Sequence, residues 1–272
     1  MQTGKWFCAD AGLTSWCSYA ASRLNMKIIP LSEGSFTIDK TKQFVPFDES
    51  AHQLNDRPTG SLLVEIQPFV VITSKDILLL DTGLGFEKDG KLQLHQNLVD
   101  AGINPSEITK VLLSHLHKDH SGGISVEREG LGQRLSFPQA TYFVQRAELE
   151  FALGKGSASY IPEELTGLQN NSSVHFLEGD GVIDEYIYYQ VTGAHSPYHQ
   201  VFRIEDEGEI IFFGADDAPQ IQQMKHRFSA KYDYDGKKAM ELRREWWEQG
   251  ERQNWTFLFY HDVKTPVWKF GA

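Results

Sequence analysis

Short runs of apolar residues, many of them β-branched or aromatic, recur along this chain with turn residues between them. In the first half these runs occupy 26–31, 61–67, 69–73, 77–80, 111–113 and 141–144, and their lengths predict strands rather than helices. Residues 92–101 have helical spacing and end at Gly102, and residues 146–153 are predicted as a helix that Gly154 stops. Strands alternating with helices favour an α/β domain in which helices cover the outer faces of packed sheets.

The second half of the chain shows the same kind of alternation. Runs at 174–177, 187–191, 200–204 and 210–213 resemble an antiparallel meander, with a turn at Glu207-Gly208 between the last two. Residues 236–250 are rich in good helix formers and predict a helix, and residues 255–260 predict a final strand. Because no linker or low-complexity tract follows residue 26, we expect one domain over 26–272.

Composition narrows the range of partners. The 26 basic and 37 acidic residues give a net charge of −11, and such a field repels polyanions, so we expect no nucleic-acid partner. Uncharged apolar runs stay well below the roughly 18 residues that a membrane span requires, so we expect no membrane partner. Cys8 and Cys17 are the two cysteines of the chain, which does not suit a disulfide framework.

The first residues differ from the body of the chain. Residues 1–25 carry Trp6, Trp16 and both cysteines, and Met26 then opens the first predicted strand. We interpret 1–25 as a leader or extension that precedes the domain. Asp10 and scattered polar residues leave no apolar core of the kind that a secretory signal needs, so a cytoplasmic location is the expectation.

The segment that carries most chemistry follows the predicted strand at 111–113. It contains His115, His117, Asp119 and His120 within six residues. In an extended chain, residues 115, 117 and 119 point to one side, and a turn near Gly122 can bring His120 beside them. Imidazole and carboxylate groups are ligands for Zn²⁺, Fe²⁺ and Mn²⁺, so this spacing predicts a metal site at the end of a buried strand.

The run His115-Leu116-His117-Lys118-Asp119-His120 is similar to the HxHxDH signature of the metallo-β-lactamase superfamily. Four further motifs of that superfamily have counterparts in the same order, at residues 79–83 (Leu-Leu-Asp-Thr-Gly), 192–200, 213–216 (Phe-Gly-Ala-Asp) and 260–262 (Tyr-His-Asp). The resemblance extends from about Met26 to Phe270. It implies an αββα sandwich of two mixed β-sheets flanked by helices, with the site along one edge of the packed sheets.

The same resemblance implies which residues hold metal. His115, His117 and His195 would hold one divalent ion, and Asp119, His120 and His261 a second one, with Asp216 bridging the two. Zinc is the first choice, with iron and manganese as alternatives. Such a pair lies about 3.5–4 Å apart and shares a water that supplies hydroxide near neutral pH. Asp81 of the first motif is interpreted as orienting a ligating imidazole by accepting its other ring N–H.

Some positions near these motifs leave alternatives open. Asp217 adjoins Asp216 and is the reserve candidate for the bridge. His199 is interpreted as a hydrogen-bonding support rather than a ligand. Tyr232 and His226 follow Asp216 where lactonase-like members place a substrate-facing insertion, so either side chain could polarise a carbonyl or protonate a leaving group. The segment around Tyr232 could equally be a turn that caps the next helix.

These features predict a hydrolase in which a metal-bridging hydroxide attacks an ester-like bond, with a lactone first in line. Tyr232 and His226 are the candidate catalytic side chains, and Asp119 is the next candidate proton donor. The alternatives are a thioester hydrolase of the glyoxalase II type, a phosphodiesterase, and a diiron redox or metal-binding protein. No organic cofactor is expected; the expected partner is a small-molecule substrate, and a homodimer is the oligomer considered.

Overall fold

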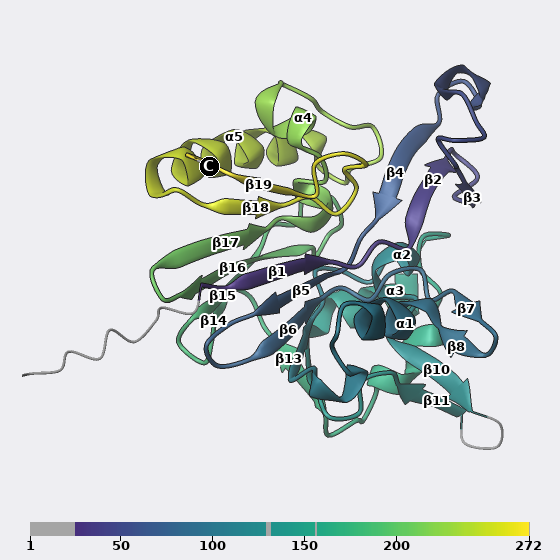
Figure 1. The fold of residues 1–272 in the computed structure, drawn as a ribbon, viewed down its shortest axis with the longest axis vertical. Helices are drawn as coiled ribbons and strands as arrows, with labels where there is room; N and C mark the ends of the chain where they lie inside the picture. The colour runs from purple at the N-terminus through teal and green to yellow at the C-terminus, as the bar shows by residue number, and fades with distance from the viewer. Residues whose placement is uncertain (1–24, 129–131, 156, 272) are drawn as a thin grey trace, which may run out of the picture.

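The structure is a computed structural model, and it describes residues 25–128, 132–155 and 157–271. The extension interpreted at 1–25 therefore lies outside the described residues, apart from Asn25. Two six-stranded sheets form the centre of the molecule (Figure 1). Among the described residues, no helix combines the length and the apolar character that crossing a membrane would require.

The first sheet contains, in spatial order, β1 (Lys27–Pro30), β5 (Phe69–Ile72), β6 (Ile77–Leu80), β9 (Lys110–Leu112), β12 (Thr141–Gln145) and β13 (Val174–Leu177). The pairs β1–β5 and β5–β6 are antiparallel. From β6 through β9 and β12 to β13 the strands are parallel. Parallel strands need crossover connections, and two of these contain α1 (Gln93–Asp100) and α3 (Arg146–Lys155).

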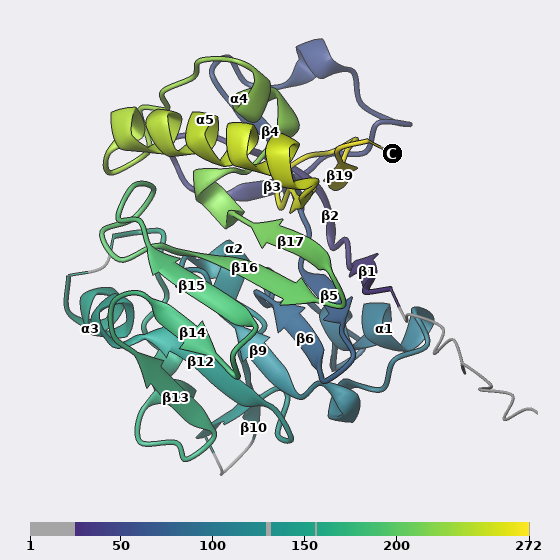
Figure 2. The same ribbon diagram turned by 90° about the vertical axis from the view of Figure 1, so that its left-hand side faces the viewer.

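The second sheet contains β14 (Gly181–Ile183), β15 (Ile187–Val191), β16 (Gln200–Asp206), β17 (Glu209–Phe213), β18 (Thr256–Leu258) and β19 (Val267–Lys269). All neighbours are antiparallel except β17 and β18, which are parallel. The crossover between these two contains α4 (Ile221–Lys225) and α5 (Gly236–Gln253), and Figure 2 shows α5 lying along this sheet.

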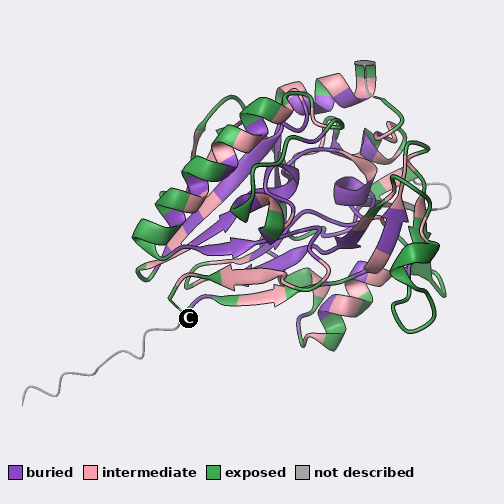
Figure 3. Cartoon of the chain, turned by 90° about the horizontal axis from the view of Figure 1, so that it is seen from above, coloured by how far each residue is buried: buried purple, intermediate pink, exposed green. Residues whose placement is uncertain are grey.

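The alternation of side chains along the strands builds three apolar layers. On β6, Leu78 and Leu80 face the space between the sheets, where they join Phe202 and Phe213 of the second sheet. Leu79 points the other way and joins a cluster with α1 and α3. The outer face of the second sheet packs in the same manner against α5, whose outward face is exposed (Figure 3). The predicted αββα sandwich is therefore confirmed.

Smaller elements surround this sandwich. A three-stranded sheet contains β3 (Phe44–Pro46), β2 (Gly34–Ile38) and β4 (Leu62–Ile66). Two hairpins are formed by β7 (Glu87–Lys88) with β8 (Lys91–Leu92) and by β10 (Ser125–Arg128) with β11 (Gly132–Leu135). Short 3-10 helices span Leu54–Asp56, Pro105–Glu107, Glu164–Leu168 and Ala215–Asp217, and α2 (Lys118–Ser121) is a single helical turn.

Some details of the predicted strands and helices are wrong. The strand at 174–177 belongs not to the meander but to the first sheet, where β13 pairs in parallel with β12. The helix from Arg146 is not stopped by Gly154 but continues to Lys155. The helix from Gly236 does not end at Gly250 but continues to Gln253, and Asn254, whose backbone is left-handed, ends it. Gly250 lies within the helix, where Phe257 packs against it in the place that a Cβ would occupy.

Candidate metal centre

The seven predicted metal donors meet where several strands end at one edge of the sandwich. His115 and His117 follow β9, and His117 precedes the first turn of α2 with the extended φ −64° and ψ 146°. The prediction of an extended run as far as residue 119 is wrong, because α2 begins at Lys118. Asp119 and His120 therefore project from a helical turn.

The second sheet supplies the other three donors. His195 follows β15, Asp216 lies on the 3-10 turn after β17, and His261 follows β18. The pairing of these strands with their neighbours makes β15, β17 and β18 run in the same direction. Their carboxyl ends consequently reach the same edge, which explains how residues far apart in the sequence come together.

The donors form two groups within which the candidate ligand atoms lie no more than 4.8 Å apart. We call His115, His117, His195 and Asp216 the first group, and Asp119, His120 and His261 the second group. Asp216 of the first group also reaches the second group. Its Oδ2 is 3.1 Å from His195 Nε2, while its Oδ1 is 3.0 Å from His120 Nε2 and 2.9 Å from His261 Nε2.

The neighbouring Asp217 has a different position. Its Oδ1 accepts a hydrogen bond of 2.8 Å from the backbone N–H of His195, and its Oδ2 lies 3.1 Å from Nδ1 of His199. Both side chains are fully buried. Of the two carboxylates left open by the sequence, Asp216 alone joins the donor groups, and Asp217 supports the loop that carries His195.

Buried polar atoms without partners show that these groups fit cations. His115 Nε2, His120 Nε2 and Asp216 Oδ1 are all buried and make no hydrogen bond of acceptable geometry. Leaving such atoms unpaired costs free energy, and a bound ion is one way to satisfy several of them together. Five imidazoles and two carboxylates form a donor set that divalent metal ions accept.

Burial and the neighbouring charges decide the protonation of the donors. Burial lowers the pKa of His115 and of His117 well below the usual range, so both rings are neutral and present lone pairs. Burial alone would raise the pKa of Asp216, but His261, His120 and His195 hold it well below its ordinary value. Conversely, Asp216 raises the pKa of His195 and of His261 against the effect of burial. Ion binding would therefore compete with protons at these rings.

Hydrogen bonds at the outer ring nitrogens fix the imidazoles of the second group. Asp81 Oδ2 lies 2.7 Å from His120 Nδ1, which matches the orienting role interpreted from the sequence. The Asp81 backbone is left-handed with φ 58°, and its carboxylate also accepts from Ser114 N–H and Oγ–H at 2.7 Å each. His261 Nδ1 is 2.8 Å from the Glu65 carbonyl. With these bonds made, Nε2 of each ring is directed to the shared carboxylate.

The first group has supports that no sequence motif indicated. Asp233 Oδ1 lies 2.9 Å from His195 Nδ1. Glu148 of α3 accepts from the Leu116 backbone N–H at 3.0 Å and from the Tyr160 hydroxyl at 3.1 Å, and the Tyr160 ring packs edge-on against His117. A buried carboxylate in a helix after the motif carries no spacing signal, so sequence reasoning missed it.

The two predicted substrate-facing side chains differ in position. The ring of Tyr232 lies edge-on to that of His195 with a centroid distance of 6.1 Å, and the residue is 38% exposed. His226 is an exposed residue at the end of α4, and no hydrogen bond, ion pair or ring contact in the described part of the chain joins it to either donor group. The structure therefore brings Tyr232, and not His226, to the candidate metal centre.

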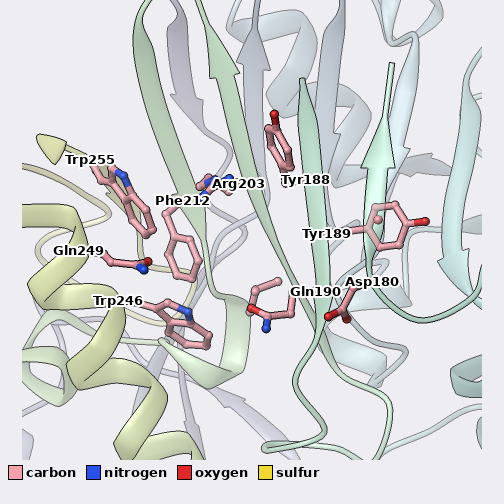
Figure 4. A pocket seen from close by; sticks show the side chains of 11 residues that line it. Asp180, Tyr188, Tyr189, Gln190, Arg203, Phe212, Trp246, Gln249 and Trp255 are labelled. Atoms are coloured by element: carbon pink, nitrogen blue, oxygen red, sulfur yellow. The ribbon is translucent and has the colours of Figure 1, made fainter. Parts of the chain in front are cut away.

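A separate cavity of about 260 Å³ lies on the outer face of the second sheet beside α5 (Figure 4). Trp246, Trp255, Phe212 and Tyr188 supply aromatic walls, and Arg203 lies over the Tyr188 ring. None of the seven donors lines this cavity. The cavity is therefore separate from the candidate metal centre at the sheet edge.

Comparison with known proteins points to one family. A family model described as the metallo-beta-lactamase superfamily matches residues 64–245. Over 116 residues the chain is 30% identical to the N-acyl homoserine lactonase AttM of Agrobacterium fabrum, and this match covers 38% of each of the two proteins. The matched part thus spans well under half the length of that curated relative.

Two solved structures share the fold over nearly the whole chain. A probable metal-dependent hydrolase from Staphylococcus aureus has a TM-score of 0.74 at 22% identity, with 90% of this chain and 92% of that one covered. The dizinc quorum-quenching lactonase AidC, in complex with a product, has a TM-score of 0.67 at 20% identity, with 89% and 90% covered. Since the family model spans more than half of the sequence, the chain belongs to the metallo-beta-lactamase superfamily.

Proposed function

We propose that this protein is a hydrolase that uses two divalent metal ions, zinc in the first place, to open the ester bond of a lactone. One observation carries the proposal: Asp216, a member of the first group, is within 3.1 Å of an imidazole nitrogen in each group. Relatives named as N-acyl homoserine lactonases make an N-acyl homoserine lactone the first substrate to test.

The residues would divide between the ions by their positions. His115, His117 and His195 would hold the first ion, Asp119, His120 and His261 the second, and Asp216 both. Ions bound there would supply an activated water and a Lewis acid at one place, which is the chemistry that ester hydrolysis needs. The protein keeps these donors in place through the outer bonds of their rings, such as the one between His120 and Asp81.

Tyr232 is the side chain that we propose to act on the substrate. Burial raises the pKa of its phenol to about 12, so the hydroxyl keeps its proton at neutral pH and can donate to a developing oxyanion or a leaving alkoxide. Its partial exposure beside His195 leaves it within reach of a bound molecule. Nothing in the geometry supports the same role for His226.

Asp119 is the second candidate for moving a proton. Its Oδ2 lies 3.6 Å from His261 Nε2 and 3.8 Å from His120 Nε2, and its side chain keeps 12% of its surface exposed. A carboxylate beside two imidazoles that keeps part of its surface exposed can carry a proton between the site and water. The cytoplasmic location, a small-molecule substrate and a homodimer remain predictions for the whole protein.

Turnover assays on purified, zinc-loaded protein would test the proposal. We expect hydrolysis of N-acyl homoserine lactones well above that of thioesters and of bis(p-nitrophenyl) phosphate, with activity lost after chelation and regained with metal. Faster thioester or phosphodiester hydrolysis would replace the lactone by that substrate class. Zinc-loaded protein that hydrolyses none of the three would contradict the hydrolase proposal and favour a redox or metal-binding role.

A further inference from the structure

The loop that carries His195 is held by a segment outside the five sequence motifs. Residues 232–235 lie against it, and two backbone hydrogen bonds join them: Tyr234 N–H donates to the His195 carbonyl at 3.1 Å, and Asp235 N–H donates to the Ala194 carbonyl at 2.7 Å. The same segment presents the carboxylate of Asp233 to the imidazole, with Oδ1 2.9 Å from Nδ1.

We propose that Asp233 is a positioning residue for the metal centre, which fixes the orientation and the tautomer of His195 from a segment that begins sixteen residues after Asp216. A carboxylate at Nδ1 keeps the proton on that nitrogen, so Nε2 retains its lone pair. Nε2 is the atom that faces the other donors, at 3.1 Å from both Asp216 Oδ2 and His117 Nδ1. The inference rests on the proposed metal site and does not depend on the substrate.

Asp233 is itself held by α5. Its side chain is only 2% exposed, and so is that of Arg243, whose Nη2 lies 3.9 Å from Asp233 Oδ2. The guanidinium also donates to the Phe228 carbonyl at 3.0 Å, to the Ala239 carbonyl at 3.2 Å and to the Gln223 side chain. A buried carboxylate without a cation would be costly, so Arg243 makes it possible to keep a negative charge behind His195.

The two donor groups thus receive equivalent support from different sources. His120 of the second group has Asp81, which lies in the first of the five motifs. His195 of the first group has Asp233, which lies 38 residues further along the chain. Each group therefore has one imidazole polarised by a buried carboxylate, and removal of either carboxylate should weaken one ion more than the other.

Zinc affinity, measured by competition with a chromophoric chelator, would test this inference on the full chain. In Asp233→Ala we expect one of the two ions to bind about 10- to 100-fold more weakly than in the wild type, with the other unchanged. Asp233→Asn retains the shape but not the charge, so it should show a smaller loss in the same direction. If the alanine variant does not fold, the asparagine variant carries the test.

Asp235→Ala is the matched control. Asp235 belongs to the same segment, but its side chain caps α5 by accepting from Lys238 N–H at 3.0 Å. This variant should lose thermal stability and keep wild-type affinity for both ions. Wild-type affinity for both ions in either Asp233 variant, or an equal loss of affinity in Asp235→Ala, would overturn the inference. Failure of the wild type to bind two ions would instead refute the proposed function, so the two failures are distinguishable.

Discussion

Glu33 is a buried carboxyl group whose ionisation should make the stability of this fold depend on pH. The residue is 5% exposed, its Oε2 accepts a hydrogen bond of 2.6 Å from Leu84 N–H, and its Oε1 has no partner. Gly83 approaches so closely, with φ +74°, that a Cβ there would lie 2.3 Å from Oε2. Burial raises the pKa of Glu33 from its ordinary value of 4.5 to about 7, although the bond from Leu84 opposes this.

The size and the sign of the effect follow from linkage. Each pH unit by which the folded and unfolded pKa values differ corresponds to about 1.4 kcal/mol, so the rise from 4.5 to about 7 corresponds to about 3 kcal/mol. Because the folded state binds the proton more tightly, this stabilisation is fully present below the unfolded pKa. It is lost as the pH rises through the folded pKa.

Urea denaturation of the wild type and of Glu33→Gln at about pH 5 and about pH 8 would measure this contribution. The amide cannot ionise. Between these two pH values, the free energy of unfolding of the variant should therefore rise by about 2–3 kcal/mol relative to that of the wild type. Other titrations, including those of the histidines, cancel in the comparison. Glu178→Gln, at a side chain that is 76% exposed, is the control and should follow the wild type. A Glu33→Gln difference that does not change with pH would refute the reasoning.

Further predictions concern the site, the core and the extension. Tyr232→Phe should lower kcat/KM for the best substrate about 100-fold with metal content unchanged, whereas His226→Ala should leave both unchanged; steady-state kinetics with metal analysis would measure this. Trp246→Ala should lower the free energy of unfolding in urea by about 3 kcal/mol, because the ring is buried against Phe212 at a centroid distance of 4.9 Å. A chain that begins at Met26 should fold and keep its metals, and loss of soluble protein on that truncation would contradict the predicted domain boundary.

The strands and the donor cluster were predictable because their physical signals are local. A four-residue run such as Ile77–Leu80 is too short for a helix and is bounded by turn residues, and the structure has it as a strand buried on both faces. The sequence did not predict β2 because Gly34 and Ser35 weaken its strand pattern. This strand is stabilised by its pairing with β3 and β4, which depends on the tertiary structure.

The parts of the site that were missed depend on contacts between distant residues. The choice between Asp216 and Asp217 depends on the 3-10 turn, where Ala215 has φ 42° and successive carboxylates point in different directions. No sequence rule connects Asp233 with His195 across 38 residues. The contact exists because α5 holds this segment against the loop, and such packing is decided by the whole fold rather than by a motif.

The metal-to-protein ratio of the zinc-loaded, desalted protein tests the central claim most directly. If His115, His117 and His195 form one site, Asp119, His120 and His261 form another, and Asp216 serves both, then elemental analysis should find two zinc ions per chain. Asp216→Ala should lose tight binding of both ions, and His115→Ala should lose mainly one. A single tightly bound ion in the wild type, unchanged in Asp216→Ala, would contradict a centre built on a shared carboxylate.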